Sequence, residues 1–151
     1  MAERTWQGLA LRVGTAQLLC GVSRVAEIAD PGPVTPVCGT VGWFAGLAGL
    51  RGNVLPVTDL AAFLGVREEG PGEHARVLVI RRDEENFGLL VDEVLGLRKF
   101  PAAALSADVA SVPDGLAMYV IEVIHDNGAT LPVLDPDLLI GSEKFLNVRA
   151  N

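Results

Sequence analysis

The sequence predicts a mainly β protein made of two similar lobes, each a set of short strands that closes into a small barrel. First, the apolar runs are short and separated by turns, in a chain with 17 glycines and 9 prolines. Second, one stretch is echoed 76 positions later, which indicates an internal duplication. Third, 50% of the residues are hydrophobic and 21% are charged, which favours a packed core over disorder. When a sheet of such strands closes into a small barrel, the hydrogen-bonding groups of its edge strands are paired.

Length, charge and cysteine usage narrow the class of protein. A chain of 151 residues suits one domain or two small lobes, and it can bury a core without a disulfide or a metal. The net charge of −7 argues against nucleic acid and against an anionic membrane surface as partners. No apolar run reaches the ~18 residues of a membrane span, and residues 1–6 carry no apolar signal core. Cys20 and Cys38 lie among apolar residues, so both are expected to be buried in a cytoplasmic protein.

The first elements are a hairpin and an extended loop. Residues 9–13 and 17–22 are apolar runs on either side of Gly14 and Thr15, which is typical of a hairpin. Residues 22–28 can form a strand or a single helical turn. Three prolines in residues 30–36 predict an extended loop, and residues 41–44 follow as a helical turn anchored by Trp43 and Phe44.

A second hairpin leads into a short helix. Strands are predicted at 47–50 and 54–57, joined by a turn at residues 51–53 in which Gly52 and Asn53 can take positive φ. Pro56 lacks an N–H, so its strand requires an edge position or a bulge there. The following helix has Thr58 or Asp59 as its cap, an apolar face and a terminal glycine; its residues are Leu60, Phe63, Leu64 and Gly65.

The second half contains more strands than helices. Residues 66–75 are polar and glycine-rich, and they are the predicted link between the lobes. Residues 101–115 are expected to be irregular, apart from one helical turn. The Asn127–Gly128 pair is a strong hairpin signal. The predicted strands are 77–80, 87–91, 94–100, 118–124 and 130–134, with turns at 83–86, 92–93 and 126–128.

The internal repeat separates shared residues from private ones. The sequence GNVLPVTDLAAFLG begins at Gly52, and GATLPVLDPDLLIG begins at Gly128 without a gap. The residues that recur in both copies are expected to build the lobe; in the first copy they are Leu55, Pro56, Val57, Asp59 and Gly65. Arg51 does not recur, because the matching position holds Asn127. The needs of the fold therefore do not account for this arginine.

The residues do not predict an enzyme, a metal site or a cofactor. His74 and His125 lack an adjacent nucleophile and an orienting acid. Asp92 and Glu93 are expected to be a surface pair pointing to opposite faces of a strand. Asp135 is the counterpart of the cap Asp59, and the ligand series of a calcium loop is missing.

Three blocks of the sequence together resemble the CheW-like domain, the coupling scaffold of bacterial chemosensory arrays. They are GLRGNVLPVTDLAAFLG, ARVLVI and FGLLVDEVLGLRKFP, and the resemblance covers residues 9–140. The ends WQGLALRVG and FLNVRA look more like the coupling proteins of the type IV pilus branch than like flagellar ones.

The resemblance implies a single domain of two packed, SH3-like five-stranded barrels with short helices. The expected parts are lobe 1 at about 14–70, lobe 2 at about 71–141 with the N-terminal strand, and a C-terminal tail at 142–151. The resemblance further implies a cytoplasmic, non-catalytic adaptor between a chemoreceptor tip (PilJ-like) and the regulatory domain of a CheA- or ChpA-like histidine kinase, without a cofactor.

The resemblance also assigns binding residues. The receptor-binding groove between the barrels is expected to contain Val22, Val25, Ile28, Arg51, Gly52, Asn53, Leu89, Val91 and Val94. The kinase-binding end of the first barrel is expected to contain Glu27, Val34, Pro36 and Val37. Gly49 departs from the family, which usually has asparagine there.

Other interpretations of these residues stay open. By pattern alone, the valines can be ordinary core residues and Arg51 a solvated surface charge. A small-molecule sensor built on the same barrels, a flagellar-type coupling protein and a homodimer with a self-occupied groove are the alternatives in function.

Overall fold

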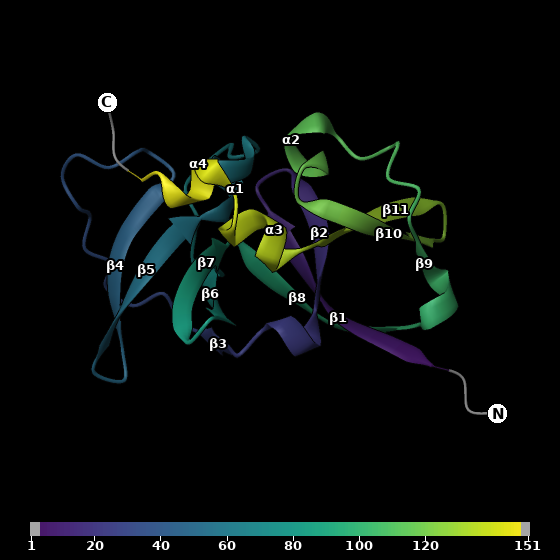
Figure 1. Cartoon of the computed structure of the whole chain (residues 1–151), viewed down its shortest axis with the longest axis horizontal. Helices are drawn as coiled ribbons and strands as arrows, with labels where there is room; N and C mark the ends of the chain where they lie inside the picture. The colour runs from purple at the N-terminus through teal and green to yellow at the C-terminus, as the bar shows by residue number, and fades with distance from the viewer. Residues whose placement is uncertain (1–3, 149–151) are drawn as a thin grey trace.

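The computed structural model describes residues 4–148, which form two β-sheets with short helices between them (Figure 1). The mainly β, two-lobed prediction is confirmed, although among the described residues only one sheet has the expected five strands and the other has six. The first sheet has the strand order β8-β1-β2-β11-β10-β9, and the second has the order β3-β6-β7-β5-β4. The strands of the first sheet are β1 (Thr5–Val13), β2 (Ala16–Gly21), β8 (Glu93–Pro101), β9 (Leu105–Ser106), β10 (Val120–Asp126) and β11 (Ala129–Leu134). Those of the second are β3 (Glu27–Ala29), β4 (Phe44–Leu50), β5 (Asn53–Asp59), β6 (Arg76–Arg82) and β7 (Glu85–Val91).

The two sheets repeat one topology. In each, an antiparallel hairpin (β1–β2 or β6–β7) pairs in parallel with the last strand of a second hairpin (β10–β11 or β4–β5). The duplicated stretches found in the sequence are therefore β5 with α1 (Leu60–Leu64) and β11 with α3 (Pro136–Ile140). From here on, the sheet formed by β3, β4, β5, β6 and β7 is called the first barrel, although it was introduced above as the second sheet. The six-stranded sheet that contains β1 is called the second barrel.

The strands divide between the barrels differently from the expected lobes. β2 falls within expected lobe 1 but belongs to the second barrel, and β6 and β7 fall within expected lobe 2 but belong to the first. The chain crosses between the barrels at η1 (Val22–Arg24) and at Asp92. Residues 66–75 connect α1 to β6 of the same barrel, so their polar composition reflects exposure and not a boundary between lobes.

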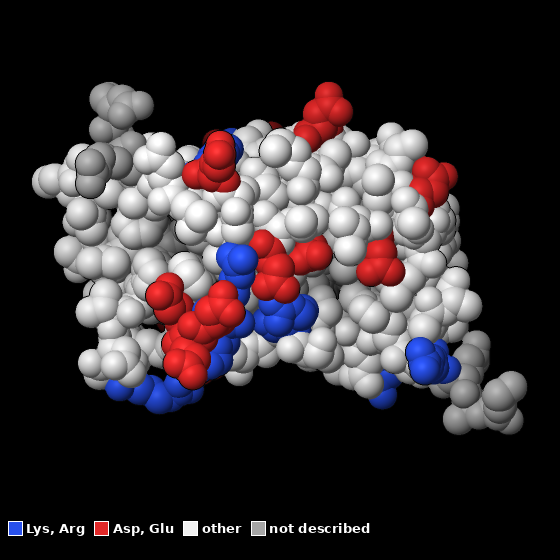
Figure 2. Space-filling view, viewed as in Figure 1, with Lys and Arg blue, Asp and Glu red and all other residues white. Residues whose placement is uncertain are grey.

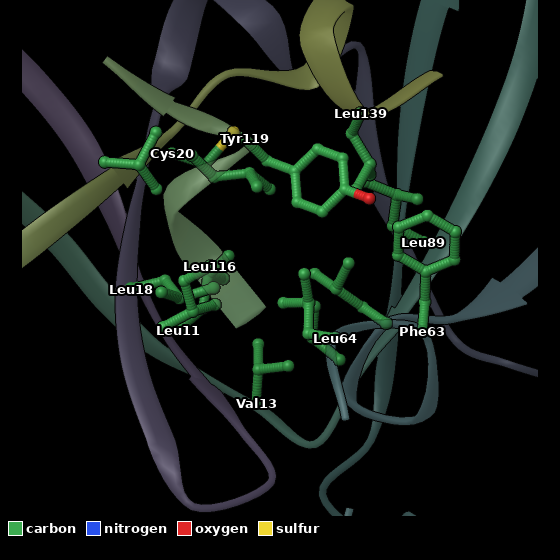
Figure 3. Close-up of a cluster of buried hydrophobic side chains, with 14 of the residues drawn as sticks. Leu11, Val13, Leu18, Cys20, Phe63, Leu64, Leu89, Leu116, Tyr119 and Leu139 are labelled. Carbon is green, nitrogen blue, oxygen red and sulfur yellow. The ribbon is translucent and has the colours of Figure 1, made fainter. Parts of the chain in front are cut away.

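Three apolar clusters follow from strand alternation. In β6, Val77 and Val79 point into the first barrel, whereas Leu78 and Ile80 point into the core between the barrels. A third cluster around Leu19 fills the second barrel. Figure 3 shows the central cluster, to which both barrels and the short helices contribute side chains. Strands buried on both faces appear in the sequence as continuous apolar runs.

Hairpin and cap signals placed most local features correctly. The β4–β5 turn consists of Arg51 (φ 47°) and Gly52 (φ 81°), so the non-glycine residue at positive φ is Arg51 and not Asn53. Asp59 caps α1 by accepting a hydrogen bond from the Ala62 N–H (3.2 Å), and Gly65 ends that helix. The expectation of an edge strand or a bulge at Pro56 was wrong, because β5 is an inner strand and the irregularity of its pairing with β4 lies between Phe44 and Gly46. Pro56 precedes the parallel pairing of β5 with β7, which begins at Val57, so its missing N–H leaves no gap in that pairing.

Other local expectations need correction. Cys20 is buried, but Cys38 is exposed because its loop lies outside the cores. Met118 lies before β10 and is 72% exposed. The irregular stretch after β8 contains η2 (Ala102–Ala104), β9 and α2 (Asp114–Ala117). The expected C-terminal tail includes α4 (Glu143–Leu146), whose Phe145 is buried, and its residues 149–151 lie outside the described part of the chain.

Candidate partner-binding surfaces

The turn between β4 and β5 carries an ion pair that closes the first barrel. Arg51 contacts Glu27 of β3, with side-chain exposures of 70% and 28%. β3 and β4 are the two edges of this sheet, so the contact holds the tip of one edge hairpin against the other edge strand. A backbone bridge between Thr35 and Leu47 also ties the preceding loop to β4. The pair joins a residue expected to face the receptor to one expected to face the kinase.

The backbone at Arg51 shows that the turn does not require arginine. Its φ of 47° lies in the left-handed region, which costs a branched-chain or long residue roughly 1–2 kcal/mol. The matching turn of the second barrel has the same geometry with Asn127 (φ 49°), a residue that tolerates this conformation. A Cβ added at the neighbouring Gly49 would meet nothing within 4 Å, so the space around this position does not exclude the asparagine that the family usually has there.

The expected receptor-binding residues separate into exposed and buried groups. Val22 and Ile28 are 40% and 44% exposed, and Gly52 and Asn53 are exposed beside Arg51. Val25 and Val94 are half-buried and pack against the central core.

Two members of this set are corrected. Leu89 and Val91 are fully buried, because these alternate residues of β7 point into the core between the barrels. Their side chains cannot reach a docked partner. The apolar pattern of GLLVDEV therefore reflects packing of these side chains in the core between the barrels.

Two exposed leucines of β8 extend the apolar surface beyond the residues that the sequence singled out. Leu95 and Leu97 are 44% and 51% exposed. Leu97 pairs with Leu9 of β1, while Val22 directly follows Gly21, which pairs with Gly8 of the same strand. Leu97 and Val22 thus flank β1 on its two sides. The alternation of β8 could have suggested these leucines.

The expected kinase-binding residues gather near the β4 edge of the first barrel, except for Glu27 on β3. Pro36 and Val37 are exposed, and Val37 is 38% accessible. Val34 is half-buried and packs against the core of the first barrel. Glu27 lies on the opposite edge strand, where it contacts Arg51 of the β4–β5 turn.

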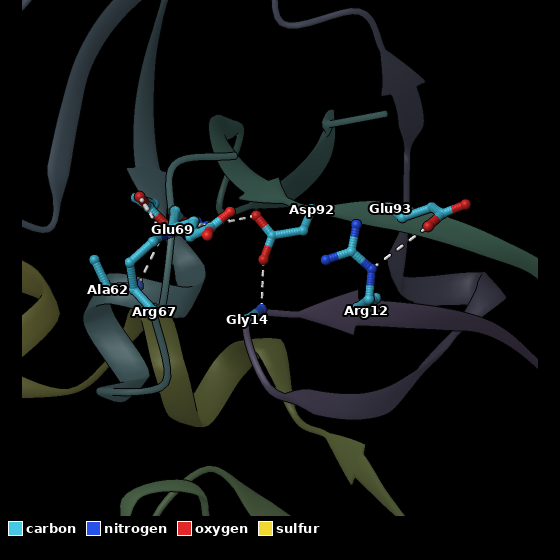
Figure 4. A network of polar contacts seen from close by, with 8 residues as sticks. Arg12, Gly14, Ala62, Arg67, Glu69, Asp92 and Glu93 are labelled. Carbon is cyan, nitrogen blue, oxygen red and sulfur yellow. Dashed lines mark hydrogen bonds and ion pairs between the residues drawn. The ribbon is translucent and has the colours of Figure 1, made fainter. Parts of the chain in front are cut away.

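Sequence reasoning missed a polar network centred on Arg67 (Figure 4). Arg67 binds Asp59 through two guanidinium nitrogens, and its Nη1 donates to Asp92 Oδ1 at 2.6 Å. Asp92 also accepts from the Gly14 N–H. Asp92 is 2% exposed, so the expectation of a surface pair with Glu93 was wrong for this residue. Burial acts to lower the pKa of Arg67, but its hydrogen bonds and charge interactions with Asp59 and Asp92 outweigh burial and raise that pKa above its usual value.

One surface hollow and the two histidines are the candidates for a catalytic or ligand site among the described residues. The hollow, of about 330 Å³, is lined by polar and apolar residues including Trp6, Arg24, Ile121 and Asp137. His125 Nδ1 lies 3.2 Å from Thr130 Oγ1, and His74 lies 3.6 Å from Glu73 on the surface. Among residues 4–148, no cluster of side chains could hold a metal ion. No helix in that part of the chain is long and apolar enough to cross a membrane.

Opposite charges are mixed on the surface. Figure 2 shows basic side chains beside acidic ones around α3 and the β6–β7 hairpin. Arg24 and Arg82 both approach Asp137 there, at 2.8 and 3.9 Å. This face therefore lacks the continuous basic patch that phosphate binding requires.

Comparisons with known proteins agree with this architecture. The family model of the CheW-like domain matches residues 7–144. Protein PilI of Pseudomonas aeruginosa is 31% identical over 147 residues, which are 97% of this chain and 82% of PilI. FrzA of Myxococcus xanthus is 34% identical over 120 residues, 78% of this chain and 72% of FrzA. Chemotaxis protein CheW of Thermotoga maritima is 25% identical over 92% of this chain and 90% of its own length.

A solved structure shows the same fold. The crystal structure of scaffolding protein TtCheW from Thermoanaerobacter tengcongensis superposes with a TM-score of 0.80 at 16% identity. The match covers 91% of this chain and 90% of that one.

Proposed function

This chain belongs to the CheW-like family, and from that premise we propose that it is a non-catalytic adaptor that couples a chemoreceptor to a CheA-type histidine kinase. The observation that carries the proposal is the family match over residues 7–144, joined by the likeness to PilI over 97% of the chain. A two-barrel body with exposed apolar positions suits a protein that works by binding.

The proposal extends to the branch of chemosensory systems. PilI and FrzA both match this chain at more than 30% identity. We therefore propose a cytoplasmic adaptor in the type IV pilus branch, with a PilJ-like receptor and a ChpA-like kinase as partners. A flagellar-type role is the alternative, favoured by the likeness to the Thermotoga CheW.

The receptor surface of the proposal consists of the exposed and half-buried members of the expected set. An amphipathic helix would place its apolar stripe on Val22, Ile28 and the neighbouring Val25 and Val94, as helices do in apolar grooves. The Arg51 turn, with Gly52 and Asn53, would then orient that helix, because charge at the edge of an interface contributes more to orientation and specificity than to affinity.

The kinase surface of the proposal lies along the β4 edge of the first barrel, with Glu27 on the opposite edge strand β3. It consists of Glu27, Val34, Pro36 and Val37. The Arg51–Glu27 contact makes the two proposed surfaces neighbours. One adaptor could thus hold both partners close together.

Co-purification from the native cell tests the proposal. Tagged wild-type protein is expected to capture a chemoreceptor and a CheA-type kinase, and the identity of the receptor separates the pilus branch from the flagellar branch. Arg51→Ala is expected to keep the circular dichroism spectrum and the melting temperature while capturing less of either partner.

Arg98→Ala is the matched control. Arg98 is also an exposed arginine paired with a carboxylate, Asp126 at 2.7 Å, but it belongs to the second barrel. This variant is expected to capture both partners normally. Unchanged capture by Arg51→Ala would remove the proposed role of that turn, and capture of neither partner by the wild type would overturn the proposal as a whole.

A further inference from the structure

The network around Arg67 connects segments that belong to different barrels. Asp59 ends β5 of the first barrel, and Gly14 lies in the β1–β2 turn of the second. Asp92 is the single residue between β7 and β8, where the chain passes from the first barrel to the second. Arg67 bridges Asp59 and Asp92, and Asp92 in turn holds the Gly14 N–H. Figure 4 labels Gly14, Arg67 and Asp92, and a dashed line marks the contact between Asp92 and Gly14.

The backbone on both sides of this network is fixed as well. The Val66 carbonyl accepts a hydrogen bond from the Thr15 N–H at 3.1 Å. A Cβ at Gly14 would lie 1.9 Å from that same Val66 oxygen, so the segment carrying Arg67 is seated directly on the turn. The Asp92 N–H donates to the Arg12 carbonyl at 3.0 Å, which anchors the crossing point to β1. Arg67 itself also donates to the Glu69 carbonyl at 2.9 Å.

The apolar core between the barrels constrains their orientation less sharply than directional polar contacts do. Contacts between aliphatic side chains are non-directional, and cores that keep their volume lose uniqueness of packing before they lose stability. A guanidinium with paired carboxylates is directional, since its donors are fixed in one plane and carboxylates accept them in defined positions. Asp92 is 2% exposed and Arg67 is 18% exposed at the side chain, so water competes little for these contacts.

We propose that Arg67 is a positioning residue that fixes the orientation of the first barrel relative to the second. It does so by holding the crossing residue Asp92 and the end of β5 in one place. Val25 and Val94, which flank the core between the barrels, then keep the spacing that a docked helix requires. This last consequence rests on the proposed function, whereas the placement of the barrels does not.

A distance measurement between the barrels tests the proposal without any partner. Nitroxide labels are placed on Glu85→Cys in β7 and Ala129→Cys in β11, two exposed strand positions in different barrels. Cys38, which is exposed, is changed to serine. Cys20 stays unlabelled because burial raises the pKa of its thiol to about 12, so almost no reactive thiolate forms near neutral pH.

The doubly labelled protein is expected to give a single narrow distance by pulsed electron resonance. Arg67→Met, which keeps the length of the side chain and removes its donors, is expected to broaden or shift that distance while the amide protection of the strands persists. Arg98→Met is the control, because it removes an exposed ion pair between two residues of the same barrel, Arg98 and Asp126. It is expected to leave the distance unchanged.

An unchanged narrow distance in Arg67→Met would overturn the proposal. If Arg67→Met does not fold, Asp59→Asn decides, since asparagine still caps α1 but loses the charge that faces Arg67. A broadened distance in Asp59→Asn supports the proposal, and an unchanged one overturns it. Capture of partners by the Arg67 variant is measured separately: normal capture with a broadened distance would overturn only the consequence for binding.

Discussion

The guanidinium of Arg51 is paired with the carboxylate of Glu27, so the tip of the β4–β5 hairpin is held against the opposite edge strand of its own barrel. Both residues belong to proposed binding surfaces. A partner that forms an ion pair with one of these two residues competes with the contact that this residue makes with the other. Occupancy of one surface would therefore alter the electrostatics of its neighbour.

A charge exchange separates the role of this pair in the fold from its role in binding. Glu27→Arg alone is expected to lower the free energy of unfolding by about 0.2–1 kcal/mol, since exposed pairs are worth little. The double variant Glu27→Arg with Arg51→Glu is expected to restore stability in urea unfolding, because the pair re-forms. Capture of partners is expected to remain weak, because partner groups that face positions 27 and 51 then meet a charge of the opposite sign. Recovery of capture in the double variant would show that only the internal pair matters.

Arg51→Asn is expected to make the fold slightly more stable. Asparagine relieves part of the roughly 1–2 kcal/mol of left-handed backbone strain, and the lost ion pair costs about 0.2–1 kcal/mol. The net expected gain is about 0.5 kcal/mol. Urea unfolding measures it. The reciprocal Asn127→Arg in the second barrel is expected to lower stability. Marked destabilisation by Arg51→Asn would show that the pair holds the hairpin.

Gly14→Ala is expected to be one of the costly substitutions in the chain. Its φ is +58°, and a Cβ would lie 1.9 Å from the Val66 carbonyl oxygen. Backbone strain and steric overlap together predict a loss of about 3 kcal/mol. Gly32→Ala is the matched control, because Gly32 has a φ of +55° but open space around it.

The control is expected to lose only about 1 kcal/mol, the cost of strain alone. Thermal unfolding of the two variants gives the difference. Equal losses would mean that Val66 moves away at little cost, and that the segment carrying Arg67 is not firmly seated on the β1–β2 turn.

Stability is expected to fall in alkaline solution because of Cys20. Burial raises the pKa of its thiol from 9.0 to about 12, so the unfolded chain releases this proton at lower pH than the folded one. The contribution is complete below pH 9.0 and is lost as the pH rises towards about 12. The slope is about 1.4 kcal/mol per pH unit in that window.

Urea unfolding at pH 8 and pH 10 isolates this effect. Wild type is expected to lose about 1.4 kcal/mol more between the two values than Cys20→Ala does. Other groups that titrate there are common to both proteins and cancel in the difference. Cys38→Ser, which changes the exposed thiol, is expected to behave as wild type. An equal loss in Cys20→Ala would show that the thiol is not shielded from solvent.

Local chemistry explains which predictions were correct. The hairpin at Asn127 and Gly128, the cap at Asp59 and the helix end at Gly65 depend on residues within a few positions of one another. The repeat predicted two similar lobes because the same local signals occur twice. The resemblance to the CheW-like family rested on the same short blocks.

Long-range pairing explains what was missed. Whether Leu89 faces a groove or a core depends on which sheet covers that side of β7, and no neighbour in the sequence decides this. Asp92 was expected at the surface because carboxylates usually are. Its burial is possible only because Arg67 arrives from a segment that looked like a linker.

By itself, the sequence determined that this chain folds as two related sets of short strands with capped helices, and that Arg51 is not needed to build them. Only the tertiary structure decided which strands share a barrel, through the parallel pairings of β5 with β7 and β11 with β2. It also decided that Arg51 meets Glu27 and that Arg67 meets Asp92. The physical reason is that turns and caps depend on nearby residues, whereas pairing depends on which buried faces and charges meet after the chain has crossed between the barrels.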